Sequence, residues 1–256
     1  MQPASDGLLP DWPAPPGVRA LFTTRAGGVS SSPFDSFNLG DHVKDEPLAV
    51  AVNRERLAAF LAPARPVFLR QVHGTAVVRL SPDTPDGTEA DGCVAVGPGA
   101  AATIMVADCL PVLLAHASGT AVAAAHAGWR GLAHGVIEAT VQALGDAAGE
   151  GDVVAWLGPC IGPQAFEVGP EVCAAFVGPD PGAAAHFWPR GDGKFLADLP
   201  ALARRRLRAV GVTQIHGNDG SGDWCTVAQD SRFFSHRRDA ARLGSTGRMA
   251  ACVWIV

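Results

Sequence analysis

The sequence predicts a single α+β domain, and three observations lead to this fold class. The chain has 256 residues, of which 48% are hydrophobic and only 18% are charged, so it can bury a large core. Short apolar runs bounded by turn residues fill its middle, which is typical of strands. Longer stretches with helical signals flank these runs, and no low-complexity linker or internal repeat divides the chain into two smaller domains.

The first elements follow from local patterns. Residues 1–16 are rich in proline, which predicts an extended arm ahead of a catalytic domain that spans residues 17–256. Residues 18–24 form an apolar run that predicts a strand, and residues 25–40 are a loop rich in Gly and Ser. Acidic residues followed by Pro47 suit a first helical turn, so we expect a helix over residues 47–61.

The middle of the chain is expected to form one buried sheet system. Each expected strand is a short apolar run that ends at a turn. These strands span residues 67–69, 76–80, 103–107, 111–116 and 120–125. A turn that contains glycine, at residues 126–131, then leads into one long Ala-rich helix over residues 132–148.

The last part of the chain is expected to mix strands, helices and loops. We expect strands at residues 153–157 and 250–256, a turn at 158–163, helices at 170–177 and 198–210, and a loop at 180–193. Arg204, Arg205 and Arg206 cannot all share one face of a helix, which indicates a solvated helix surface.

Charge and hydropathy exclude several classes of partner. The net charge is −5, which argues against broad electrostatic capture of nucleic acid or of an anionic membrane. The chain starts without a signal-peptide pattern, and no apolar stretch approaches the ~20 residues needed to span a bilayer. We therefore expect a cytoplasmic, monomeric protein, and without a P-loop or a GxGxxG motif it needs no nucleotide cofactor.

Cysteine and histidine patterns exclude two kinds of site. The six cysteines are scattered without a CxxC motif, so a disulfide framework is not expected. The eight histidines contain no HxH pair, which argues against the copper centres of a multicopper oxidase.

Three short segments each place a metal ligand beside a tight turn. They are residues 71–74 with His73, residues 107–111 with Cys109, and residues 125–129 with His126. Each ligand lies near the end of a predicted strand, where side chains from adjacent strands converge. Two imidazoles and one thiolate suit Zn²⁺, and three protein ligands leave a fourth position for water or substrate. Any one of these residues is more often structural, so their spacing alone leaves the metal role open.

Taken together and in order, the motifs of this chain resemble those of the YfiH family. They occupy residues 24–30, 37–40, 71–74, 107–111, 126–131, 158–162 and 234–239. Members of this family were formerly called laccase-domain proteins or multicopper polyphenol oxidases, and are now described as purine nucleoside phosphorylases with adenosine deaminase activity. The resemblance covers nearly the whole chain from Arg25 onward.

The resemblance implies a fold, a metal and a set of reactions. It implies a layered α/β/β/α sandwich and a zinc site formed by His73, Cys109 and His126. It also implies phosphorolysis of adenosine, inosine, guanosine and methylthioadenosine to the free base and ribose 1-phosphate, and deamination of adenosine to inosine. The partners are then a purine nucleoside and phosphate. Copper is an adventitious occupant to consider, because it binds such ligands more tightly than zinc does.

Five further residues are candidates for the site. Deamination requires a carboxylate that moves a proton to the leaving amine, and Asp108 and Glu167 are candidates by their positions in the motifs. Asp108 is equally suited to holding a turn. Arg25 and Arg130 lie beside glycines and are candidates for binding phosphate, with surface ion pairs as the alternative. Asn38 is a candidate for hydrogen bonding to base or ribose, or for capping a turn.

Two other function classes stay open at this point. In a metal-free cysteine hydrolase or amidase, Cys109 is the nucleophile and His126 its base, as in the similarly folded cytotoxic necrotizing factor deamidases. Such an enzyme could act on a cell-wall amide in peptidoglycan precursor editing, but a Cys–His dyad does not require His73. In a non-enzymatic binding module, zinc only staples the sheet, and Cys160 or His236 would supply a fourth ligand.

Overall fold

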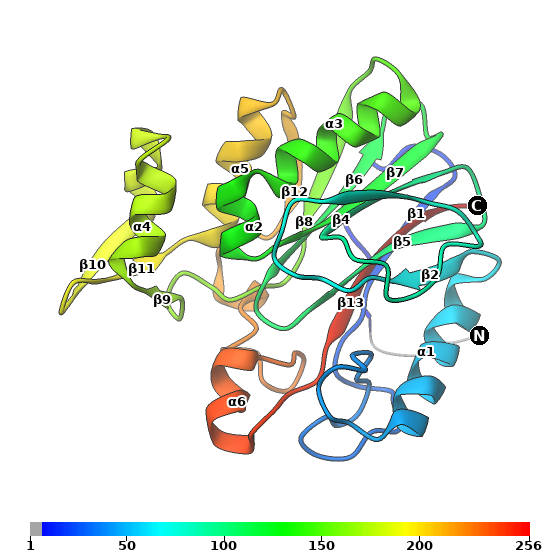
Figure 1. The fold of residues 1–256 in the computed structure, drawn as a ribbon, viewed down its shortest axis with the longest axis horizontal. Helices are drawn as coiled ribbons and strands as arrows, with labels where there is room; N and C mark the ends of the chain where they lie inside the picture. Colours follow the sequence, from blue (N-terminus) through cyan, green and yellow to red (C-terminus); the bar gives the residue numbers. More distant parts are fainter. Residues whose placement is uncertain (1–6) are drawn as a thin grey trace.

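The computed structural model describes residues 7–256 and shows two large sheets packed face to face between helices (Figure 1). The first sheet consists, in spatial order, of β1 (Val18–Phe22), β13 (Met249–Ile255), β5 (Ala100–Val106) and β2 (Arg65–Phe68). The second consists of β12 (Gln214–Gly217), β8 (Val153–Leu157), β6 (Leu110–His116), β7 (Ala121–Ala127), β4 (Gly92–Val96) and β3 (Val77–Leu80). Both sheets contain parallel and antiparallel pairs.

Alternate residues along the central strands pack into different layers. In β6, Leu113 and Ala115 belong to the core between the two sheets, whereas Val112 and Leu114 belong to the core under the helices. This follows from the period of two residues along a strand. Because both faces are covered, β5, β6 and β7 are buried along their whole length, which explains why they form continuous apolar runs in the sequence.

Helices cover the outer faces of both sheets. Leu57 and Leu61 of α1 (Pro47–Leu61) pack with Trp254 on the first sheet. On the second sheet, α3 (Val136–Ala148) and α5 (Leu199–Ala209) contribute Leu144 and Leu202 to one core cluster. The order of layers is helix, sheet, sheet, helix, so the predicted four-layer α+β fold is confirmed. None of the helices in residues 7–256 is long and apolar enough to cross a membrane.

A third, small sheet projects from one side of the molecule. It consists of β10 (Phe187–Gly191), β11 (Lys194–Ala197) and β9 (Glu167–Val168), and Figure 1 shows it with α4 (Pro170–Val177), away from the two large sheets. The prediction of a loop over residues 180–193 is wrong, because a 3₁₀ helix (Pro181–His186) and β10 occupy most of this segment. Most of β10 is exposed, so this strand lacks the apolar run on which the prediction relied.

Other elements match the sequence prediction to different degrees. The helices at residues 47–61 and 170–177 and the strand at 153–157 are confirmed with their boundaries, and the other predicted strands shift by a few residues. The helix predicted over residues 132–148 is in fact α2 (Trp129–His134) followed by α3, because Gly135 is left-handed, with a φ of 99°. Strands β4, β9, β11 and β12 and the mostly polar helix α6 (His236–Leu243) have no counterpart in the prediction.

The three arginines of α5 are partly buried and each pairs with another segment, which the prediction of a solvated helix surface did not include. Arg204 donates hydrogen bonds to backbone carbonyls of β12, at 2.9 and 3.0 Å. Arg205 forms an ion pair with Asp180, and Arg206 pairs with Glu138 of α3 at 2.9 Å. Each arginine ties α5 to a different neighbour. Asp180 and Glu138 lie 25 and 68 residues away from their arginines, too far for a local pattern to reveal them.

The described part of the predicted N-terminal arm lies along β1. Leu8 exchanges two backbone hydrogen bonds with Phe22, with N–O distances of 2.8 and 2.9 Å. Trp12 packs against the core between the sheets. Residues 1–6 of the predicted arm lie outside the described residues.

The break between α2 and α3 can be tested by adding a methyl group. Gly135→Ala should lower the free energy of unfolding by about 1 kcal/mol, because a Cβ is unfavourable at a left-handed position. The matched control is Gly145→Ala within α3, where nothing lies within 4 Å of an added Cβ. This control should raise the free energy by about 0.5–1 kcal/mol. Urea denaturation measures both, and stabilisation by both variants would contradict the break at residue 135.

Candidate metal centre and active-site cavity

His73, Cys109 and His126 converge at one end of the second sheet. Their ligand atoms all lie within 4.8 Å of one another, and Nε2 of His73 is 3.7 Å from Sγ of Cys109. His126 is the next-to-last residue of β7, and Cys109 directly precedes β6. Antiparallel pairing places Pro111 opposite His126, so the start of β6 lies beside the end of β7. The structure therefore brings together the three residues that the sequence singled out.

A buried carboxylate that the sequence analysis missed holds two of these histidines. Oδ1 of Asp91 accepts hydrogen bonds from Nδ1 of His126 at 2.8 Å and from the backbone N–H of His73 at 2.9 Å. Its Oδ2 accepts from the N–H groups of Val72 and Gly74, at 3.1 and 2.7 Å. Burial disfavours the charged form, but the hydrogen bonds from His126 and Gly74 outweigh it and lower the pKa of Asp91.

The electrostatics of the centre favour a thiolate. Burial raises the pKa of the Cys109 thiol, but the charges of His126 and His73 and the hydrogen bonds to their rings together outweigh burial and lower this pKa to about 6. Burial also lowers the pKa of His126, whereas Cys109 and Asp91 together raise it to about 9. The thiolate is the form of cysteine that binds metals and attacks electrophiles, so the pair suits either chemistry.

The donor set fits a zinc ion. Bond lengths of about 2.0 Å to nitrogen and 2.3 Å to sulfur in a tetrahedral site place the two atoms about 3.6 Å apart. The observed separation of His73 Nε2 and Cys109 Sγ is 3.7 Å. Within residues 7–256 only three side chains form such a group, and neither Cys160 nor His236 joins it as a fourth ligand. Three protein ligands are characteristic of catalytic rather than structural zinc sites.

The three ligands line a cavity of about 740 Å³, a volume that suits a small-molecule substrate. Its lining is rich in cationic side chains. The arginines that line it are Arg54, Arg70, Arg130, Arg237 and Arg248. Among these, only Arg130 was predicted from the sequence. Its guanidinium stacks over Trp129 at 4.3 Å.

The lining arginines differ in whether a carboxylate neutralises their charge. Arg54 pairs with Asp41 at 3.2 Å, and Arg70 pairs with Glu89. Arg130, Arg237 and Arg248 form no ion pair with any carboxylate in the part of the chain that the structure describes. These three arginines leave the cavity with positive charge that an anionic ligand can neutralise.

Asp108 lines the cavity, and both of its carboxylate oxygens have partners. Oδ1 accepts a hydrogen bond from the Thr226 hydroxyl, and Oδ2 accepts from the backbone N–H of Arg237, both at 2.6 Å. Asp108 has a positive φ of 86° and directly precedes Cys109. Its carboxylate therefore anchors the start of α6, with His236 and Arg237, against the segment that carries the thiol.

Asn38 is buried behind the cavity rather than in its lining. Its side-chain oxygen accepts hydrogen bonds from the backbone N–H groups of Gly40 and Arg248, at 2.9 and 2.8 Å. Its amide nitrogen donates to Asp45 at 2.8 Å. Asn38 therefore fixes the backbone of a cavity arginine, which is the turn-holding role that the sequence left open for it.

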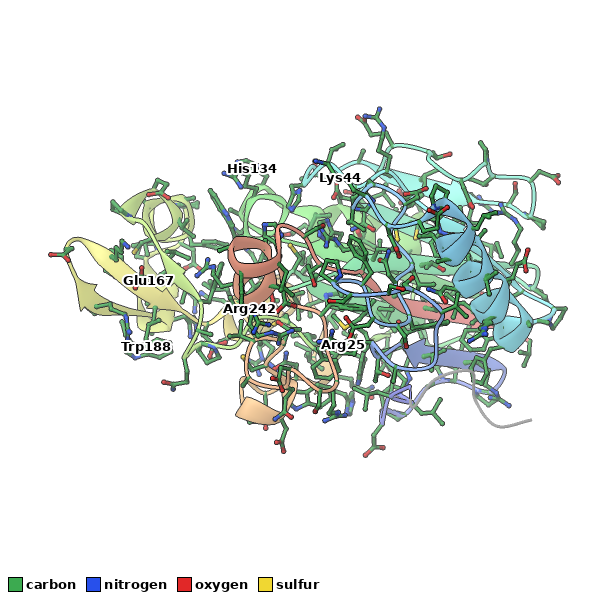
Figure 2. The ribbon with its side chains drawn as sticks, turned by 90° about the horizontal axis from the view of Figure 1, so that it is seen from below. Arg25, Lys44, His134, Glu167, Trp188 and Arg242 are labelled. Carbon is green, nitrogen blue, oxygen red and sulfur yellow. The ribbon has the colours of Figure 1, made fainter. Side chains whose placement is uncertain are left out.

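Arg25 and Glu167, which were expected in the site, do not line the cavity. Arg25 forms an ion pair with Asp35 at 3.1 Å, which is the surface pairing that was its alternative. Glu167 pairs with Lys194 at 2.7 Å on the small sheet. Figure 2 shows Glu167 at the end of the molecule that also carries Trp188. The motif position suggested Glu167, but β9 turns its carboxylate toward the neighbouring strands.

Fold and site together define a class of four-layer α+β proteins with a His–Cys–His centre in a basic cavity. The model of a family described as multi-copper polyphenol oxidoreductase laccase matches residues 19–256. The chain belongs to this family, which includes the proteins named YfiH, and the resemblance found in the sequence is confirmed.

Relatives match nearly the full length of the chain. A Pseudomonas aeruginosa protein named purine nucleoside phosphorylase is 53% identical over 249 residues, which are 97% of this chain and 98% of the relative. Purine nucleoside phosphorylase YfiH of Escherichia coli is 50% identical over 250 residues, with the same coverage of 97% and 98%. The crystal structure of the Neisseria meningitidis protein NMB0706 has a TM-score of 0.89 at 45% identity, covering 98% of this chain and 99% of that one.

Close packing around the centre can be tested at Gly128. An added Cβ would lie 2.7 Å from Cδ2 of His73 and 3.0 Å from Sγ of Cys109, so both side chains would have to move. With Zn²⁺ as the probe, Gly128→Ala should therefore weaken metal binding about tenfold or more, as the loss of ligand-orienting groups does. Competition with a chromophoric chelator measures the affinity. Gly222→Ala, where nothing lies within 4 Å, is the control. Wild-type affinity in Gly128→Ala would refute the close approach.

Proposed function

We propose that this protein is a zinc-dependent purine nucleoside phosphorylase. The observation that carries the proposal is the basic cavity built around His73, Cys109 and His126. Relatives that are 53% and 50% identical over nearly their whole length are named purine nucleoside phosphorylase. The proposed substrates are adenosine, inosine, guanosine and methylthioadenosine, which yield the free base and ribose 1-phosphate or its methylthio analogue.

The arginines of the cavity suit the phosphate. In phosphorolysis, a phosphate oxygen bonds to the anomeric carbon while the bond from this carbon to the purine nitrogen breaks. The electron pair of that bond leaves with the base, which takes up a proton. Arg130, Arg237 and Arg248 offer guanidinium groups without carboxylate partners in the described residues, so they can hold the phosphate against the sugar.

In the same cavity, adenosine would be deaminated to inosine. His73, Cys109 and His126 would hold the zinc ion, which when bound lowers the pKa of water toward neutrality. Asp108 lines the cavity next to Cys109 and is the remaining candidate for moving the proton to the leaving amine. Its two hydrogen bonds also orient it. Glu167 has no part in this proposal, because it lies outside the cavity lining.

The oxidase function suggested by the family description has less support. A multicopper oxidase requires several histidine-rich centres. Within residues 7–256, one group of three His, Cys, Asp or Glu side chains is arranged to hold a metal, and it includes a single cysteine and two histidines. Copper at this centre would therefore be an adventitious substitute for zinc.

One observation favours a second candidate, a cysteine hydrolase that acts on an amide, for example in peptidoglycan precursor editing. Cys109 lies beside His126, which bonds to Asp91, and this order of groups matches a Cys–His–Asp catalytic triad. His73 has no role in such a triad. Stoichiometric zinc that is lost in Cys109→Ala supports the phosphorylase, whereas a metal-free protein that iodoacetamide alkylates at Cys109 supports the hydrolase.

Phosphate dependence tests the proposed reaction directly. Zinc-loaded protein incubated with adenosine should release adenine only when phosphate is present, because phosphate is the attacking group. Inosine should form with or without phosphate. Chromatography of the products measures both reactions, and Cys109→Ala should lose both. If no purine nucleoside is converted by protein with verified zinc, the proposed function is wrong.

The phosphate site can be tested at Arg130. Arg130→Gln should raise the KM for phosphate about tenfold or more, because a hydrogen bond to a charged group contributes about 1.5–3 kcal/mol. The KM for the nucleoside should change much less. Arg79→Gln is the matched control, since Arg79 is exposed on β3 and does not line the cavity. Steady-state kinetics with each substrate varied in turn separates the two effects, and an unchanged KM for phosphate would exclude Arg130.

A further inference from the structure

Asp91 connects two of the three residues of the metal centre through one fully buried carboxylate. Its four hydrogen bonds come from the ring of His126 and from three successive backbone N–H groups, those of Val72, His73 and Gly74. A buried carboxylate needs such partners to remain charged. Asp91 directly precedes β4, outside the motifs that identified the site.

The hydrogen bond to His126 fixes which ring nitrogen is free. A carboxylate only accepts hydrogen bonds, so Nδ1 of His126 must carry the proton that it shares with Asp91 at 2.8 Å. Nε2 is then the nitrogen that faces Cys109 and can bind a metal. A carboxylate behind a ligating histidine also raises the basicity of the ring.

The backbone hydrogen bonds stabilise an unusual conformation at His73. This residue has a φ of 63°, in the left-handed region, which is unfavourable for residues other than glycine. The N–H groups of residues 72–74 converge on the carboxylate and form an anion-binding concavity. The same turn directs Nε2 of His73 toward Cys109, at 3.7 Å from its sulfur.

We propose that Asp91 is a positioning residue that sets the orientation of His73 and His126 before the metal binds. It touches neither substrate nor metal and acts through these two ligands. This inference rests on the proposed metal site. No other carboxylate within residues 7–256 bonds to either histidine ring, so its loss cannot be compensated from nearby.

Asp91→Asn removes this function with little change in volume. Asparagine has one acceptor oxygen and one NH₂ group, so it cannot replace both carboxylate oxygens. With its oxygen at the Oδ1 position it still accepts from His126 and from the N–H of His73, but its NH₂ group then faces the N–H groups of Val72 and Gly74. If its NH₂ group faces His126, Nδ1 becomes the acceptor and the proton moves to Nε2, the nitrogen that should bind zinc. Zinc affinity should therefore fall about 10–100-fold, measured by competition with a chromophoric chelator. In the cobalt-substituted protein, the d–d absorption bands should also change.

Asp239→Asn is the matched control for a structural effect. Asp239 is also a buried carboxylate, and it bonds to Arg238 and Thr246, outside the cavity lining. This variant should lose thermal stability yet keep wild-type zinc affinity and cobalt spectrum. Equal zinc affinities in wild type and Asp91→Asn would overturn the positioning role alone. A wild-type protein that binds no zinc would overturn the metal site and the inference together.

A measurement on the wild-type protein covers the case in which Asp91→Asn does not fold. In zinc-loaded protein, long-range proton–nitrogen correlation spectra should show His126 protonated at Nδ1 and bound through Nε2. The signal is assigned by its absence in His126→Gln. Zinc bound through Nδ1 would overturn the inference, because Asp91 occupies that side of the ring.

Discussion

The antiparallel pairing of β6 and β7 in the middle of the second sheet is the constraint on which the site depends. Both strands are buried on both faces, so a shift of one residue would exchange the two cores that their side chains fill. The fixed register places Pro111 opposite His126 and brings Cys109 to the same edge. The sandwich therefore fixes the distance between thiol and imidazole before any ligand binds.

Buried polar side chains complete what the strand register begins. The segment that carries His73 is held at both ends, by Asp91 and by Gln71, whose amide exchanges two hydrogen bonds with the backbone of Met105, both at 2.8 Å. Asp108 fixes the start of α6 in the same way. The loops around the cavity are thus positioned by side chains that cannot leave their buried partners without a large desolvation cost.

The chemistry of the site follows from this arrangement rather than from the fold class. The family is described as a copper oxidoreductase, whereas two of its members are named purine nucleoside phosphorylase. One fold can therefore be associated with different activities. A single three-ligand centre surrounded by guanidinium groups suits an anionic reactant better than the electron transfer of several coppers. The proposed phosphorylase therefore depends on the cavity lining, which includes Arg237 and Arg248 as well as Arg130.

The sequence by itself determined the α+β class and several of the helices and strands, because these depend on local periodicity and on turn residues. Its short motifs, through their resemblance to the YfiH family, implied the four layers and singled out the three residues of the candidate metal centre. Only the tertiary structure identified Asp91, placed Arg25 and Glu167 outside the cavity and paired Arg206 with Glu138. The physical reason is distance along the chain. Asp91 bonds to a ring 35 residues away, and Asp108 to a backbone group 129 residues away, and such pairings exist only once the sheets have packed.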